Sequence, residues 1–105
     1  MNKNTIGVIG LAMRAGKLVF GSEACVEAIR NKKAFLLISV SDVSDNTAKL
    51  LADKSNYYSV RHVKSDLTMQ ELGRAIGRRS AAAAAFTDAN FVKAFDKSVG
   101  ADNKE

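Results

Sequence analysis

The apolar run from Ala34 to Val40 constrains the fold most, because it has almost no polar break. Such a run predicts a strand that is covered on both faces. The segments around it instead repeat apolar residues at helical spacing, as Ile6, Ile9 and Met13 do near the N-terminus. A strand with helices before and after it predicts an α/β fold, and 105 residues suffice for one domain.

The remaining periodicities extend this pattern along the chain. Ala81 to Ala85 favour a helix by intrinsic propensity, but the stop at Gly77 and the cap expected at Thr87 leave too few residues for one. We therefore predict a strand there, and a three-layer α/β/α sandwich with a small mixed sheet of about four strands. The expected helices are 4–15, 22–33, 46–55, 68–77 and 88–98, and the expected strands are 18–20, 34–40, 57–63 and 80–86.

Polar residues mark the expected helix starts. Ser22 can cap the second helix, and Glu23 puts a carboxylate in its first turn. Thr68 and Glu71 have the spacing of a capping box. We expect one domain over residues 1–99 and a disordered polar tail over 100–105.

The formal charge of +5 is unevenly distributed. Residues 1–40 hold six basic and two acidic groups, and residues 61–80 hold five and two, whereas the other segments are slightly acidic. If the fold joins the two basic segments, they form a patch that can neutralise phosphates. No apolar stretch approaches the ~20 residues of a membrane span, and no signal pattern is present, so we expect a cytoplasmic protein.

Catalytic and metal chemistry have little support in the sequence. Cys25 lies on an apolar helix face, where a buried thiol is the ordinary interpretation. His62 is the only histidine and lies in a strand between basic residues. Asp42 and Asp45 have turn and cap roles without a third ligand. We therefore expect no enzyme, no cofactor, no metal and no small-molecule substrate.

Two segments remain as candidate binding sites. The first leads from Lys17 to a helix start near Glu23, where free backbone amides suit a phosphate or a base edge, and we expect Lys17 and Arg14 to flank this start. The second presents the adjacent guanidinium groups of Arg78 and Arg79, for which a solvated loop is the alternative interpretation. We predict that these four basic residues lie on one surface.

The order of these pieces resembles the kink-turn RNA-binding ribosomal protein family, the L-seven-A-e type, and within it the small bacterial YlxQ-type members. The most specific pieces are Leu72-Gly73-x-Ala75-x-Gly77 and Asp42-x-Ser44-x-Asn46-Thr47. The resemblance covers residues 5–97, with matches at 11–17, 21–30, 33–38, 41–47, 56–58, 71–77 and 85–91.

The resemblance implies an α/β/α sandwich that binds sharply kinked RNA. It implies that the second helix inserts its N-terminus into a groove widened at tandem G·A pairs, and that the loop before the last strand covers an extruded base. Archaeal members have Gly-x-Asn-Glu at this helix start and Lys three residues later. The implied RNA-binding positions here are Arg14, Lys17, Gly21, Ser22, Glu23, Ala24, Glu27, Arg78 and Arg79.

Several of these positions depart from the archaeal pattern. Glu23 stands for the asparagine, Ala24 for the glutamate and Glu27 for the lysine, while two arginines replace an apolar contact in the covering loop. The implied partner is structured RNA, with ribosomal RNA as a candidate, bound by a ribosome-associated protein. The alternative is a protein-interaction module on the same scaffold that has lost kink-turn recognition.

Overall fold

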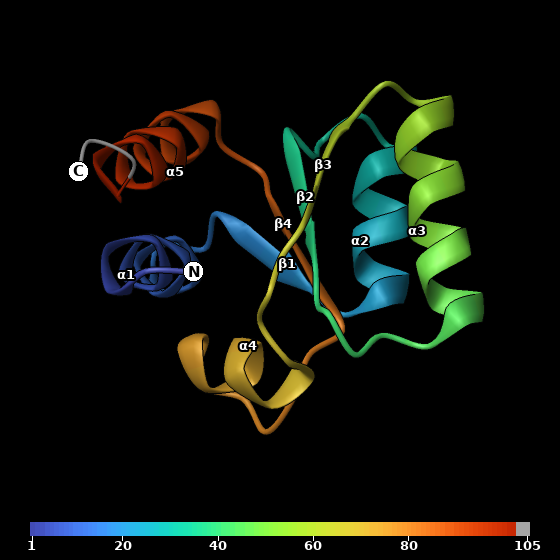
Figure 1. The fold of residues 1–105 in the computed structure, drawn as a ribbon. Coiled ribbons are helices and arrows are strands. Elements are labelled where there is room, and N and C mark those ends of the chain that lie inside the picture. Colours follow the sequence, from blue (N-terminus) through green and yellow to red (C-terminus); the bar gives the residue numbers. More distant parts are fainter. Residues whose placement is uncertain (103–105) are drawn as a thin grey trace.

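The computed structural model describes residues 1–102, the last two by their backbone alone. Helices and strands alternate along the whole of this length (Figure 1). The elements are α1 (Lys3–Arg14), β1 (Leu18–Phe20), α2 (Ser22–Arg30), β2 (Leu36–Ser39), α3 (Asp45–Tyr57), β3 (Arg61–Lys64), α4 (Met69–Ala75), β4 (Ala83–Phe86) and α5 (Ala89–Asp102).

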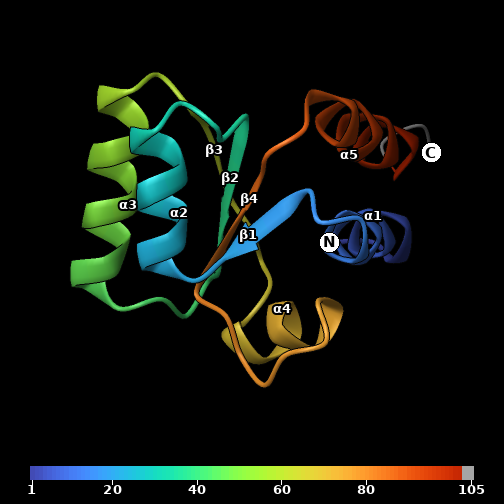
Figure 2. The same cartoon turned by 180° about the vertical axis from the view of Figure 1, so that it is seen from behind.

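The four strands form one mixed sheet in the order β1-β4-β2-β3. β4 is antiparallel to β1 and to β2, and β2 is parallel to β3. Three strands therefore run in one direction and only β4 runs back. α2 and α3 cover one face of the sheet, while α1, α4 and α5 lie on the other (Figures 1 and 2). The predicted α/β/α sandwich with a four-stranded mixed sheet is confirmed.

The alanine-rich segment forms an interior strand, as predicted. Ala83 and Ala85 pack in the core that contains α2, and Ala84 and Phe86 pack in the core that contains α1 and α5. All four residues of β4 are fully buried, so each contributes apolar burial on one face of the sheet. This tertiary burial outweighs the intrinsic preference of alanine for helix.

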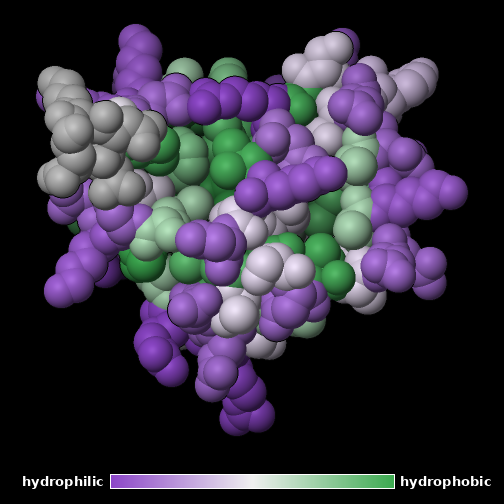
Figure 3. Space-filling view, in the orientation of Figure 1, coloured by the Kyte–Doolittle hydropathy of each residue, from purple (hydrophilic) through white to green (hydrophobic). Residues whose placement is uncertain are grey.

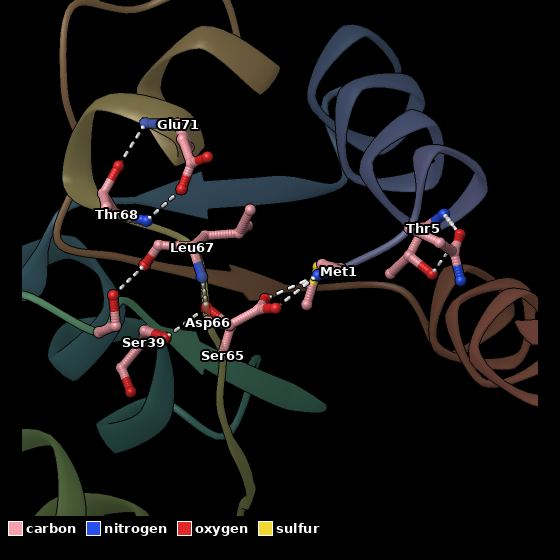
Figure 4. A network of polar contacts seen from close by, with 10 residues as sticks. Met1, Thr5, Ser39, Ser65, Asp66, Leu67, Thr68 and Glu71 are labelled. Carbon is pink, nitrogen blue, oxygen red and sulfur yellow. Dashed lines mark hydrogen bonds and ion pairs between the residues drawn. The ribbon is translucent and has the colours of Figure 1, made fainter. Parts of the chain in front are cut away.

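Four helices begin at a side chain that accepts a backbone N–H of the first turn. Asn2 caps α1, Ser44 caps α3, and Thr68 with Glu71 forms the predicted capping box of α4 (Figure 4). α5 differs from our expectation, because the Asp88 carboxylate, not Thr87, accepts the Asn90 N–H at 2.7 Å. Thr87 instead continues the contact with the segment of β1, since its N–H donates to the Lys17 carbonyl at 2.9 Å.

Several boundaries differ from the predicted ones, and the largest differences are at the start of β3 and the end of α5. α3 continues through Tyr57, so β3 begins at Arg61, four residues later than we expected from the aromatic and β-branched pattern. A tight turn ends α3, with Ser59 at φ 56° and the Val60 N–H donating to the Ser55 carbonyl at 2.8 Å. α5 also continues beyond residue 100 to Asp102, and the rest of the expected tail, 103–105, lies outside the described residues.

Two ion pairs join distant segments on the β3 side of the molecule. The N-terminal ammonium contacts both carboxylate oxygens of Asp66 at 2.7 and 2.8 Å (Figure 4). Arg61 makes a two-pronged contact with Asp96 at 2.6 and 2.9 Å. These cations lower the pKa of both carboxyl groups.

Between α5 and β3 lies a cavity of about 560 Å³, and Figure 3 shows apolar side chains there among hydrophilic ones.

Candidate nucleic-acid interface

The start of α2 is shaped by the strand before it and by a glycine. β1 pairs with β4, and the Gly21 N–H donates to the Ala83 carbonyl at 2.9 Å. Gly21 then turns the chain with φ 91°, a left-handed conformation that an L side chain rarely adopts. Ser22 is the first helical residue, so our expectation that its side chain caps the helix is wrong.

This helix start has no side-chain cap within residues 1–102, unlike those of α1, α3 and α4. The first bond that closes a helical turn is the Cys25 N–H to the Gly21 carbonyl at 3.0 Å. The amides of Ser22, Glu23 and Ala24 precede that bond, so they are the donors that a helix start leaves for other acceptors. Their partial positive charge suits an oxyanion or a base acceptor.

One side of α2 faces solvent and the other faces the core. Cys25 and Val26 are buried, while Glu23, Ala24 and Glu27 are exposed, as helical spacing requires. The three departures from the archaeal pattern therefore lie on the accessible side of the helix. Two of them give this surface negative charge.

The loop between α4 and β4 is folded back tightly onto α4. The Arg78 N–H donates to the Gly73 carbonyl at 2.7 Å, and the Ala81 N–H donates to the Met69 carbonyl at 3.1 Å. Gly73 permits this return, because a β-carbon there would lie only 2.5 Å from the Ser80 α-carbon. The backbone that carries Arg78 and Arg79 is thus held by α4, while both residues are exposed.

The loop and the start of α2 meet at an aromatic ring. The guanidinium carbon of Arg78 lies over the Phe20 ring, 5.1 Å from its centroid. This distance is within the range of a cation–π contact, and Phe20 immediately precedes Gly21. Sequence reasoning did not assign Phe20 a role, although an aromatic residue next to a turn glycine was the available signal.

The structure positions the two other basic candidates differently. The Thr87 N–H donates to the Lys17 carbonyl at 2.9 Å, so Lys17 lies at the far end of β1, about 10 Å from Phe20 at the usual strand rise. This corrects our expectation that Lys17 flanks the α2 start. Arg14 lies nearer to the loop, beside the end of α4. A β-carbon placed on Gly10 would lie 3.8 Å from Arg14 Nη1 and 3.0 Å from the carbonyl oxygen of Ala75.

The residues weighed for catalysis have structural partners. Burial raises the pKa of the Cys25 thiol to about 12, so it stays protonated and unreactive at neutral pH. His62 Nε2 lies 2.9 Å from the Ser39 hydroxyl at the boundary between β2 and β3. Asp42 accepts the Met69 N–H at 2.8 Å, as a turn residue. Residues 1–102 contain no group of three side chains arranged to hold a metal ion.

We expect His62 to make stability depend on pH near neutrality. Burial and the charge of Lys64 lower the pKa of His62 below 6.5, so the folded state disfavours its protonation. Its contribution is therefore complete above pH 6.5 and is lost as the pH falls below it. The free energy of unfolding, measured with urea, should fall more between pH 7.5 and pH 5.5 in the unmodified protein than in His62→Gln.

A different result would locate the pH response elsewhere. Asp66 and Asp96 also have lowered pKa values, but they lose their contribution only at acidic pH, below their ordinary value of 3.8. An equal loss in both proteins between pH 7.5 and 5.5 would therefore contradict the role of His62.

The architecture and the interface define the class of protein. The three-layer sandwich, with an uncapped α2 start beside an arginine-bearing loop, is that of a small α/β/α domain with a basic loop at one end of its sheet. The model of the Ribosomal protein L7Ae/L30e/S12e/Gadd45 family matches residues 3–95. The chain belongs to this family, and it is a YlxQ-like member of it.

Two curated relatives support this assignment. The chain is 42% identical over 84 residues to the RNA-binding protein YlxQ of Bacillus subtilis strain 168, covering 80% of this chain and 83% of that protein. It is 48% identical over 58 residues to the RNA-binding protein YlxQ of Enterococcus faecium, covering 55% and 56%. Neither value is reached by chance likeness of composition.

Two solved structures share the fold. A Bacillus halodurans protein of unknown function superposes with a TM-score of 0.84 at 32% identity, over 91% of this chain and 96% of that one. The 15.5 kD RNA-binding protein of Giardia lamblia superposes with a TM-score of 0.77 at 17% identity, over 95% and 88%. In this chain, no helix within residues 1–102 is both long and apolar enough to span a bilayer.

Proposed function

We propose that this protein binds structured RNA that is sharply kinked, with an element of ribosomal RNA as a candidate target. The observation that carries the proposal is the uncapped start of α2 beside Arg78, which is stacked on Phe20. Backbone amides and a guanidinium group then face the same region of solvent. The N–H groups of the backbone and of the guanidinium donate hydrogen bonds, and the oxygens of RNA phosphates accept them.

Each part of this surface has a distinct role in the proposal. The α2 start enters the widened groove, where its amides bind phosphate or base acceptors and the Glu23 carboxylate accepts from an exposed guanine amino group. Arg78 and Arg79 bind phosphates or stack on the extruded base that the loop covers. The names of the two YlxQ relatives, both RNA-binding proteins, support the same class of ligand.

One observation favours a second candidate function, a protein-interaction module. Glu23 and Glu27 line a groove of about 410 Å³ beside α2, together with Arg30, which leaves the lining one net negative charge, and the half-exposed Leu50 of α3. An acidic groove with an apolar residue suits a basic protein segment better than a phosphate. This module would have kept the scaffold and lost RNA recognition.

The dependence of RNA affinity on salt concentration distinguishes the two candidate functions of the α2 start, RNA binding and protein binding. We expect log K for a kink-turn RNA to fall with log salt concentration at a slope of roughly −3 to −5, as a few phosphate contacts would give. Fluorescence anisotropy between 50 and 300 mM potassium chloride measures this slope. Arg78→Ala with Arg79→Ala should lower its magnitude by roughly two.

The control is Lys97→Ala, which removes an exposed cation from α5, on another element. It should leave the slope nearly unchanged. An affinity that does not respond to salt, or no binding to any structured RNA tested, would favour the protein-interaction module instead.

A further inference from the structure

Three of the four strands begin at the same end of the sheet. β1 and β2 are both antiparallel to β4, and β3 is parallel to β2, so β1, β2 and β3 begin at the same end, the upper one in Figure 1. Lys17 and Phe35 lie on either side of the end of β4, because Thr87 donates to the Lys17 carbonyl and the Phe35 N–H donates to the Phe86 carbonyl, both at 2.9 Å.

Among the charged residues of the connections that lead into these three strand starts, all are basic. Residues 14–18, 30–36 and 54–61 contain seven Lys and Arg residues and no Asp or Glu. Some of these cations have an ordinary explanation, since Arg14, Arg30 and Lys54 lie in the last turns of their helices, where they offset the negative dipole end. Lys17, Lys32 and Lys33 lie beyond the helices, are exposed, and have no such explanation.

Two carboxylates that the fold brings near this end of the sheet are already engaged. Asp88 accepts the Asn90 N–H at the start of α5, and Asp96 pairs with Arg61. Neither carboxylate contacts the three lysines among the contacts of residues 1–102. The positive charge of these lysines therefore faces solvent.

Two aromatic rings are exposed among these cations. Tyr57 is 80% exposed and Phe35 is 50% exposed, which makes them two of the four large apolar side chains that face solvent among residues 1–100. Tyr57 is braced by the Tyr58 ring, edge-on at 4.9 Å, and Tyr58 packs in the core with Ala34 and Val60. Exposed rings together with flexible ammonium groups are the pattern that binds stacked bases and their phosphates.

We propose that this strand-start surface, formed by Lys17, Lys32, Lys33, Phe35 and Tyr57, binds unpaired nucleotides of an RNA strand. Bases stack on the two rings, and the three ammonium groups bind the backbone phosphates. An acidic peptide would use the ammonium groups but leave the rings unused, so the rings favour RNA. The surface lies at the opposite end of α2 from the contact proposed above, about 13 Å away along that helix, and the inference goes beyond that contact.

The test uses labelled oligouridylate of about twelve nucleotides, a length within the usual range for one binding domain. Phe35→Leu combined with Tyr57→Leu keeps apolar bulk and removes both rings. We expect this variant to bind about 10-fold more weakly, while Lys32→Ala with Lys33→Ala lowers the magnitude of the salt slope by roughly 1.4, the value for two phosphate contacts on a single strand. Arg78→Ala should leave the affinity for oligouridylate unchanged but weaken binding of a blunt-ended kink-turn hairpin.

The measurements with oligouridylate and with the kink-turn hairpin distinguish the strand-start surface from the contact at α2. If the Leu variant binds oligouridylate as tightly as the original chain, the stacking role is overturned. If oligoglutamate binds as tightly as oligouridylate, the surface belongs to an acidic protein partner and the inference is overturned. Failure of the kink-turn hairpin alone to bind would contradict only the contact at α2. Unfolding midpoints equal to that of the original chain verify that the variants fold.

Discussion

Gly73→Ala should destabilise the protein by about 2 to 3 kcal/mol, the range for forcing an atom into a packed region. The added β-carbon would lie 2.5 Å from the Ser80 α-carbon and 2.6 Å from its nitrogen, and both are backbone atoms that cannot rotate away. The loop must therefore move from α4, which breaks the bond from the Arg78 N–H to the Gly73 carbonyl. Urea unfolding measures the loss, and affinity for kinked RNA should fall with it.

Gly7→Ala is the matched control, because it makes the same change in α1 where a β-carbon would meet nothing within 4 Å. Alanine is the better helix former, so this variant should gain about 0.5 to 1 kcal/mol. If Gly73→Ala were as stable as Gly7→Ala, the close return of the loop onto α4 would not exist in solution, and the positioning of Arg78 and Arg79 would need another explanation.

Ala24→Glu combined with Glu27→Lys should tighten binding of a standard kink-turn RNA by about 1 to 3 kcal/mol, the scale of one good base contact. The first change adds a carboxylate acceptor beside the uncapped amides of α2, and the second replaces a negative charge that repels phosphate with a positive one. Both positions are exposed, so the free energy of unfolding should change little. Anisotropy titration at fixed salt measures the gain.

Arg78→Ala, measured with the same RNA, is the reference that should weaken binding. An unchanged affinity in the Ala24→Glu, Glu27→Lys variant, beside a clear loss in Arg78→Ala, would mean that the RNA reaches the loop but does not enter along α2. The roles that the family resemblance implies for Glu23, Ala24 and Glu27 would then be wrong for this chain.

Local patterns in the sequence were sufficient to predict the layers of the fold. The apolar run at Ala34 to Val40 does contain an interior strand, Leu36–Ser39, and the alanine segment could be assigned because Gly77 and the residues after it left no room for a helix. The start of β3 was mistaken, because Tyr57 and Tyr58 have strand propensity but complete and cap α3. Where a helix ends depends on the turn at Ser59, which no propensity reveals.

The site was predicted less completely than the fold. Single residues such as Glu23 and Arg78 could be identified from their segments, yet the contact between Arg78 and Phe20 depends on the pairing of β1 with β4. The same pairing separates Lys17 from the α2 start. The number of charged residues in each segment cannot reveal this separation, because it carries no information about the direction of a strand.

The two outer strands of the sheet limit how the protein can associate through its backbone. β1 is only three residues long and is bounded by Gly16 and Gly21, whose φ angles of 73° and 91° turn the chain away from the strand direction. β3 carries a charged residue at each end, Arg61 and Lys64, both exposed. Short length and charge are two means by which natural sheets prevent a strand of another molecule from extending them. Each edge of this sheet has one of them, so growth into a continuous intermolecular sheet, the first step of amyloid-like aggregation, is disfavoured at both edges.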